Sequence, residues 1–230
     1  MSDSEDKIDF AMVLASSVHD MKNSVGMLLA SLEAVIEEMP PTNARQANLF
    51  NTLHYESSRI NGELIQLLTI YRMNSDFLPV SIDEHYVVDV LEEQVARNSS
   101  LMETGNIELE LRCDEDLAWY YDLDLVGSVV HNVLVNCVRY TKSRLILSAD
   151  IEDEFLHIRI QDNGPGYPDT MLRSPTDLVD KADVNDGDTH LGLYFAECIA
   201  KMHKQNEHKG YIKLENGGEL GGGVFSLFIP

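Results

Sequence analysis

Two heptad seams dominate the first third of the chain and constrain its fold more than any other feature. The first consists of apolar residues at alternating steps of four and three, namely Leu14, Val18, Met21, Val25, Leu28, Leu32, Val35 and Met39. The second, in which only Ser57 is polar, consists of Phe50, Leu53, Ser57, Ile60, Leu64, Leu67 and Tyr71. This spacing is typical of helices that pack as in coiled coils. The intervening PPTN (40–43) ends one helix and starts the next.

We therefore predict two long helices in an antiparallel hairpin over residues 1–76. A single hairpin of this kind buries little apolar surface. We expect two copies of the chain to pair through it as a homodimer with a four-helix bundle.

The pattern changes after the second seam, and residues 77–230 are predicted to form a separate α+β domain with a mixed sheet on one side and helices on the other. Residues 78–80 suit a linker into a short strand. Helices are expected over 86–102, 122–140 (with Asp122 as N-cap) and 191–203. A polar, irregular stretch is expected over 168–188. Strands are expected over 107–112, 118–121, 144–151 and 155–162, and in the closing segments GYIKLENGG and GGGVFSLFIP.

The charge and the cysteines limit the class of protein. A net charge of −22 over 230 residues argues against nucleic acid and anionic membrane surfaces as partners, because both are polyanions. Cys113, Cys137 and Cys198 are odd in number, far apart and without metal-ligand spacing, as expected of reduced thiols. The sequence has no signal peptide and no apolar run that could span a bilayer. We therefore expect a cytoplasmic protein without a membrane sensor of its own.

A polar cluster interrupts the first helical segment, where His19, Asp20, Lys22 and Asn23 fall within five positions. His19 lies just beside the seam, and Asn23 lies one turn further along the same face. An exposed imidazole nitrogen can attack a phosphoryl group and hold it as a phosphoramidate. Asp20 can orient the ring or accept its proton. Most surface histidines are inert, so this cluster gains weight only from the motifs downstream.

Three such motifs follow. HNVLVNCVRY places Asn132 and Asn136 on one face of a predicted helix. QDNGPGYP comes directly off a strand, and Gly164 and Gly166 allow a tight turn whose backbone can approach a ligand. DTHLGLYFAECIAKMH places Gly192 where a helix begins, and helix N-termini favour phosphate. Each motif alone also suits an ordinary structural role.

In this order the motifs resemble those of the sensor histidine kinases. NVLVNCVRYT resembles the asparagine box, DNGPGYP the first glycine box and THLGL the second, while VHDMKN resembles the phospho-acceptor box. The resemblance extends over about residues 8–230. It implies a histidine-phosphotransfer hairpin followed by a Bergerat-type ATP-binding domain, an α/β sandwich. It further implies a protein histidine kinase of a two-component system or phosphorelay. Such an enzyme uses ATP and Mg²⁺ to phosphorylate His19 and passes the phosphoryl group to an aspartate of a response-regulator receiver domain.

The resemblance also implies roles for individual residues. Asn136 would ligate Mg²⁺ with Asn132 supporting it, and Asp162 would accept a hydrogen bond from the adenine amino group. On the hairpin, Asn23 would position a water molecule or phosphoryl group during dephosphorylation of a partner. The other implied nucleotide contacts are Arg139, Tyr140, Gly164, Gly166, Thr189, Leu191 and Gly192.

The second glycine box departs from the family pattern. It usually reads Gly-Thr-Gly-Leu-Gly-Leu, whereas residues 188–193 here read DTHLGL, so that Asp188 and His190 replace two glycines. The preceding lid carries further aspartates against the single Lys181, and its usual phenylalanine-containing box is not recognisable. Unneutralised carboxylates should weaken the binding of polyanionic ATP.

Two other functions therefore stay open. One is a histidine phosphotransferase or response-regulator phosphatase with a weakened ATP site, and the other is a non-catalytic dimeric adaptor. A separate sensor protein is a further expected partner.

Overall fold

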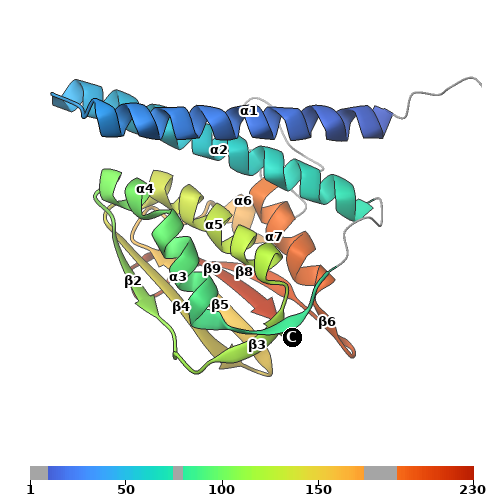
Figure 1. Cartoon of the computed structure of the whole chain (residues 1–230). Coiled ribbons are helices and arrows are strands. Elements are labelled where there is room, and N and C mark those ends of the chain that lie inside the picture. Colours follow the sequence, from blue (N-terminus) through green and yellow to red (C-terminus); the bar gives the residue numbers. More distant parts are fainter. Residues whose placement is uncertain (1–9, 75–79, 174–190) are drawn as a thin grey trace, which may run out of the picture. The chain divides into compact units, whose positions relative to one another are not determined.

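The computed structural model describes residues 10–74, 80–173 and 191–230 (Figure 1). The chain divides into two compact units, Met1–Leu78 and Pro79–Pro230. Within the described ranges, no helix combines the length and the apolar character needed to cross a membrane.

The first unit consists of two long helices, α1 (Phe10–Glu38) and α2 (Ala44–Asn74), which the two seams predict. Asn43 caps the start of α2, and the side chain of Gln46 reaches back to the residue before that cap. Asn43 Oδ1 accepts a hydrogen bond from the backbone N–H of Gln46 at 3.0 Å, and Gln46 Oε1 accepts from the backbone N–H of Thr42 at 2.9 Å. His54 Nε2 of α2 lies 3.3 Å from Glu33 Oε1 of α1, so side chains of the two helices meet.

In the described part of the first unit, several apolar side chains of each seam stay exposed within one chain. They are between 37% and 62% exposed, namely Met21, Leu28 and Val35 on α1, Met39 directly after it, and Leu53, Ile60 and Leu67 on α2. The alternating positions Val25, Leu32 and Leu64 are half-buried, and Ser57 is buried. Each helix therefore presents an unpartnered apolar stripe.

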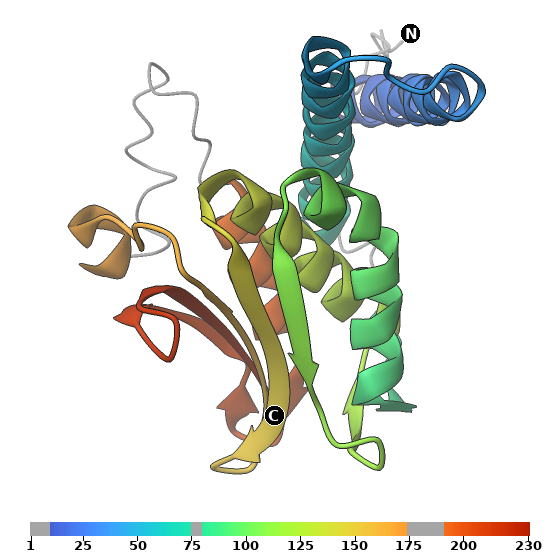
Figure 2. The same ribbon diagram turned by 90° about the vertical axis from the view of Figure 1, so that its left-hand side faces the viewer.

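The second unit is built on a five-stranded mixed sheet (Figures 1 and 2). Its strands, in spatial order, are β2 (Glu108–Arg112), β4 (Arg144–Glu152), β5 (Phe155–Asp162), β9 (Gly222–Ile229) and β8 (Tyr211–Gly217). β2 and β4 are parallel, and the other neighbours are antiparallel. Helices α5 (Leu123–Tyr140) and α7 (Leu191–Met202) cover one face. Fully buried sheet residues such as Leu147, Ile158 and Leu227 form the core. This confirms the predicted arrangement of a mixed sheet with helices on one side.

The helix predicted over 86–102 is instead two helices, α3 (Val87–Arg97) and α4 (Ser99–Thr104). The break falls at Asn98, which is fully buried. Its Nδ2 donates to the backbone carbonyl of Gln94 at 2.7 Å and lies 3.1 Å from His131 Nδ1 of α5. A side-chain amide that competes for a helical carbonyl offers the backbone an alternative to the helix, and this interrupts it.

Two smaller elements of the second unit were not predicted, and a third was. The stretch expected to be irregular begins with a short helix, α6 (Asp169–Arg173), in which the Pro168 carbonyl accepts hydrogen bonds from the N–H groups of Met171 and Leu172. A small hairpin of β6 (Lys204–Gln205) and β7 (His208–Lys209) follows α7. β1 (Asp83–Tyr86) is the short strand expected after the linker, and it pairs antiparallel with β3 (Ala118–Tyr121).

Buried hydrogen bonds around Asp122 and His203 connect the start of α5 with the end of α7. Asp122 caps α5, as predicted, because its Oδ1 accepts from the Leu125 N–H at 3.0 Å, while its Oδ2 accepts from the Ser81 N–H at 2.8 Å. The Asp122 N–H donates to Nε2 of His203 at 3.1 Å, so the ring carries its proton on Nδ1, 2.8 Å from the Ile199 carbonyl of α7. Burial lowers the pKa of His203, which favours this neutral form.

Candidate functional site

A cavity of about 440 Å³ lies between α5, the turn that follows β5 and the start of α7. Six of the predicted site residues line it: Asn132, Asn136, Tyr140, Asp162, Gly166 and Gly192. Its size falls in the range of pockets that hold small ligands. Val133, Leu193 and Phe225 add apolar walls, which suit a flat aromatic ring.

Asp162 is the buried acceptor of this cavity. It ends β5, is 7% exposed, and its Oδ1 accepts a hydrogen bond from the Gly164 N–H at 2.6 Å. Gly222 and Gly223 of β9 pass directly against the carboxylate. A Cβ added at Gly222 would lie 2.5 Å from Oδ1, and one added at Gly223 would lie 2.7 Å from Oδ2. Only glycine leaves room for this carboxylate to face the cavity.

The turn after Asp162 is held by two asparagines that sequence reasoning missed. Asn163 Oδ1 accepts hydrogen bonds from the N–H groups of residues 142–144, at 3.0–3.1 Å, and so ties the turn to the chain after α5. Asn216 of β8 clamps Tyr167, accepting from its N–H at 2.6 Å and donating to its carbonyl at 2.8 Å. Gly166 has φ of +81° and abuts Asn216, so this position requires glycine. Asn163 stood inside the quoted motif, whereas Asn216 comes from a distant strand.

Asn132 and Asn136 lie four positions apart on the same face of α5. Asn136 is exposed, and Asn132 packs against α7, where a Cβ added at Gly192 would lie 2.6 Å from Asn132 Nδ2. The place of the Asn132 amide in the cavity wall therefore depends on Gly192. Cys137 also lines the cavity, and burial raises the pKa of its thiol, which keeps it protonated rather than nucleophilic.

The other predicted site residues of the second unit either do not line the cavity or lie outside the described residues. Arg139, Gly164 and Leu191 are not among the described residues that line the cavity. The Arg139 guanidinium carbon lies 5.3 Å from the centre of the Tyr140 ring, a cation–π arrangement. Thr189 lies outside the described residues, as do Asp188, His190 and the lid aspartates.

The cluster predicted to accept the phosphoryl group lies on α1 of the first unit. His19 is part of the helix, but its side chain lies outside what the structure describes, as does that of Lys22. Asp20 and Asn23 are exposed on the same helix.

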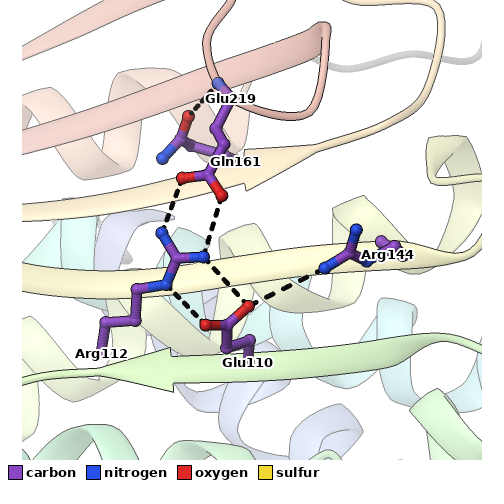
Figure 3. A network of polar contacts seen from close by, with 5 residues as sticks. All are labelled: Glu110, Arg112, Arg144, Gln161 and Glu219. Atoms are coloured by element: carbon purple, nitrogen blue, oxygen red, sulfur yellow. Dashed lines mark hydrogen bonds and ion pairs between the residues drawn. The ribbon is translucent and has the colours of Figure 1, made fainter.

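A network on the outer face of the sheet holds the turn that delivers Gly222 and Gly223 (Figure 3). The N–H of Glu219 donates to Gln161 Oε1 at 3.1 Å. The Arg112 guanidinium donates to both carboxylate oxygens of Glu219, at 2.6 and 2.9 Å, and to Glu110 at 2.7 Å. The hydrogen bonds from Arg112 lower the pKa of Glu219. The glycine-rich turn is thereby anchored to β2 and to the residue before Asp162.

The donor set fits a nucleotide with a hard cation. A buried carboxylate between glycines can accept from an amino group, and apolar walls can hold a ring. The exposed amide oxygen of Asn136 is a ligand type that Mg²⁺ accepts, with phosphate oxygens and water completing its shell.

Comparison with known proteins shows what this part of the chain is similar to. Residues 121–230 match the family model of the histidine kinase-, DNA gyrase B-, and HSP90-like ATPase. Sensor protein SrrB of Staphylococcus aureus (strain N315) is 22% identical over 224 residues, which cover 94% of this chain. The chain spans only 37% of the length of that relative.

Solved structures of histidine kinases share the fold. Histidine kinase AdeS of Acinetobacter baumannii superposes with a TM-score of 0.58 at 17% identity, covering 92% of this chain and 96% of that one. Full-length ShkA, solved in complex with AMPPNP, gives a TM-score of 0.63 at 18% identity, covering 95% of this chain and 45% of that one. These matches confirm the resemblance to histidine kinases that the motifs predict.

Proposed function

We propose that this chain, whose residues 121–230 form a histidine kinase-like ATPase domain, is a protein histidine kinase that phosphorylates His19 from ATP. The observation that carries the proposal is the cavity in which Asp162, Asn132 and Asn136 converge. From His19 the phosphoryl group passes to an aspartate of a response-regulator receiver domain, which completes a two-component signalling step.

In the proposed complex, Asp162 accepts a hydrogen bond from the adenine amino group, and the apolar walls enclose the ring. Asn136 would hold Mg²⁺ through its amide oxygen, and the ion would supply positive charge for the phosphate end of the nucleotide. Asn132 supports this end of the site, and Arg139, whose guanidinium carbon lies 5.3 Å from the centre of the Tyr140 ring, supplies a positive charge that can pair with phosphate oxygens.

In the transfer itself, an imidazole nitrogen of His19 forms a bond to the γ-phosphorus while the bond from that phosphorus to the bridging oxygen of ADP breaks. The ring loses a proton, which Asp20, next in the helix, is placed to accept. Asn23, one turn further, positions a water molecule or the phosphoryl group in the reverse reaction on a phosphorylated partner.

The uncovered seam stripes support a homodimer as the functional unit. Burying large apolar side chains on both helices against a second copy removes them from water, and four helices can pack with these residues at the centre. A receiver domain and a separate sensor protein are the further partners.

A phosphotransferase or phosphatase with a weakened ATP site is the second candidate, favoured by Asp188 and His190 in the glycine box. Replacing Asp188 by Asn removes the charge, and restoring Gly at 188 and 190 restores the family pattern. Tighter ATP binding and stronger labelling of His19 in these variants are expected if the carboxylate weakens the site. A non-catalytic adaptor is the third candidate, and it predicts no labelling in any variant.

Incubation with γ-labelled ATP and Mg²⁺ tests the proposal. We expect acid-labile, base-stable label on the parent chain and none on His19→Gln, with Asn136→Ala strongly reduced. Label that survives in His19→Gln would place the acceptor elsewhere. A parent chain that binds no ATP by calorimetry would refute the kinase and favour the phosphotransferase.

A further inference from the structure

The end of the β4–β5 hairpin away from the nucleotide cavity gathers three metal-ligating side chains. Asp150 and Glu152 are two residues apart on β4 and therefore face the same side of the sheet. His157 on β5 is the cross-strand partner of Asp150. Their ligand atoms all lie within 4.8 Å of one another. His157 stands five residues before Asp162 on the same strand, about 17 Å at the usual rise of a strand, so this cluster is separate from the nucleotide site.

The histidine is buried and its ring is fixed. His157 is 3% exposed and stacks on Phe228 of β9, with ring centroids 4.1 Å apart and planes 16° apart. Its Nδ1 points at the carboxylates, lying 2.7 Å from Glu152 Oε2 and 3.5 Å from Asp150 Oδ1. Its Nε2 has no hydrogen-bond partner in the part of the chain that the structure describes. The polar contacts of this buried ring therefore run through Nδ1, into the cluster.

The pairing of β4 with β5 fixes the positions of Asp150 and Glu152 relative to His157. Glu152 pairs with Phe155 across a two-residue turn in which Asp153 and Glu154 both have positive φ, of 49° and 67°. Such a turn matches the twist of its strands and fixes the register. Glu152 and Asp150 are therefore delivered to His157 by backbone geometry rather than by flexible loops.

Arg159 already supplies a positive charge to this cluster. Its Nη2 lies 3.1 Å from His157 Nδ1 and 3.5 Å from Glu152 Oε2. The arginine side chain is a third exposed, and both carboxylates are about half exposed. The guanidinium can therefore move into solvent and leave an imidazole nitrogen and two carboxylates open to another cation and to water.

We propose that Asp150, Glu152 and His157 form a binding site for a divalent transition-metal ion, Zn²⁺ fitting best, in which Arg159 is the competing internal cation. One imidazole nitrogen with two carboxylate oxygens is a ligand set that Zn²⁺ accepts, with water in the fourth position. Mg²⁺ prefers oxygen ligands alone, so the histidine selects against it.

The experiment is a calorimetric titration of the full chain, freed of metal by a chelator and dialysed, with ZnCl₂ at pH 7 and no nucleotide present. We expect one zinc ion per chain at this site. His157→Phe keeps the stack on Phe228 but removes the nitrogen, and it should weaken zinc binding at least tenfold, as should Asp150→Asn and Glu152→Gln. Arg159→Gln should bind zinc more tightly than the parent, because the competing cation is gone.

Asp153→Asn is the matched control. It removes a carboxylate from the same turn at a position of positive φ that asparagine tolerates, and it should bind zinc like the parent. Circular dichroism reports whether each variant folds. If His157→Phe does not fold, the exposed changes Asp150→Asn and Arg159→Gln still test the proposal. A parent that binds no zinc overturns the proposal. So does zinc binding that is indifferent to both Asp150→Asn and Arg159→Gln, or a parent that binds Mg²⁺ at this site as tightly as Zn²⁺.

Discussion

Replacing Leu28 by Glu should dissociate the homodimer that we propose. Leu28 is 54% exposed in the single chain and sits in the middle of the α1 stripe. Burying the exposed half of a leucine side chain contributes about 1 kcal/mol, so two copies contribute about 2 kcal/mol to the dimer. Glutamate loses this contribution and also brings two carboxylates into the bundle core, at a cost of several kcal/mol in desolvation or protonation. A total of at least about 4 kcal/mol weakens the dimer roughly a thousandfold.

Sedimentation equilibrium over a range of concentrations measures this effect. The parent should be a dimer at micromolar concentration, Leu28→Ala a weaker dimer by about thirtyfold, and Leu28→Glu a monomer with its helices retained. Ala30→Glu adds the same charge at an exposed position off the seam of the same helix and should stay dimeric. A monomeric parent, or equal dissociation by both glutamate variants, would show that the stripe is not the interface.

Three further predictions concern the second unit. Asp162→Asn and Asn136→Ala should each lower ATP affinity in calorimetry, by about tenfold to a hundredfold for the lost charge-assisted hydrogen bond of Asp162, with an unchanged circular dichroism spectrum. Glu219→Gln should lower ATP affinity less than Asp162→Asn does, with little change in Tm, because Arg112 and Glu219 anchor the glycine turn from the surface; equal affinity to the parent would contradict this. Burial lowers the pKa of His131 to about 4, so the unfolded chain binds a proton that the folded chain does not as pH falls below about 6.5. The free energy of unfolding should therefore drop by about 3 kcal/mol between pH 6.5 and 4, and urea denaturation of His131→Gln should lack this part of the slope.

Local sequence patterns predicted the elements because periodicity and caps are local properties. The heptad seams locate α1 and α2, and Asp122 caps α5 as its position before an apolar run implies. The asparagine spacing on α5 and the turn after β5 also led to residues that do line one cavity, among them Asn136 and Asp162.

Contacts between distant segments could not be predicted in this way. The break at Asn98 depends on His131, 33 residues later, which holds the amide where it competes for a helical carbonyl. Asn216 clamps a turn 49 residues before it, and Glu219 reaches an arginine 107 residues away. These pairings follow from strand order and register, which a single sequence leaves open.

The second glycine box keeps the glycine that lines the cavity. A Cβ added at Gly192 would lie 2.6 Å from Asn132 Nδ2, so a side chain there would displace that amide from its place in the cavity wall. The family resemblance assigns the two positions that carry Asp188 and His190 to the phosphate end of the site. We therefore expect these substitutions to act on phosphate binding and not on the adenine contacts of Asp162. Because each added phosphate brings more negative charge toward Asp188, the affinity gained from ADP to ATP should be small in this protein. Calorimetry of both nucleotides with Mg²⁺ measures it: Asp188→Asn should increase the preference for ATP over ADP, and an unchanged ratio would mean that this carboxylate does not act on the phosphates.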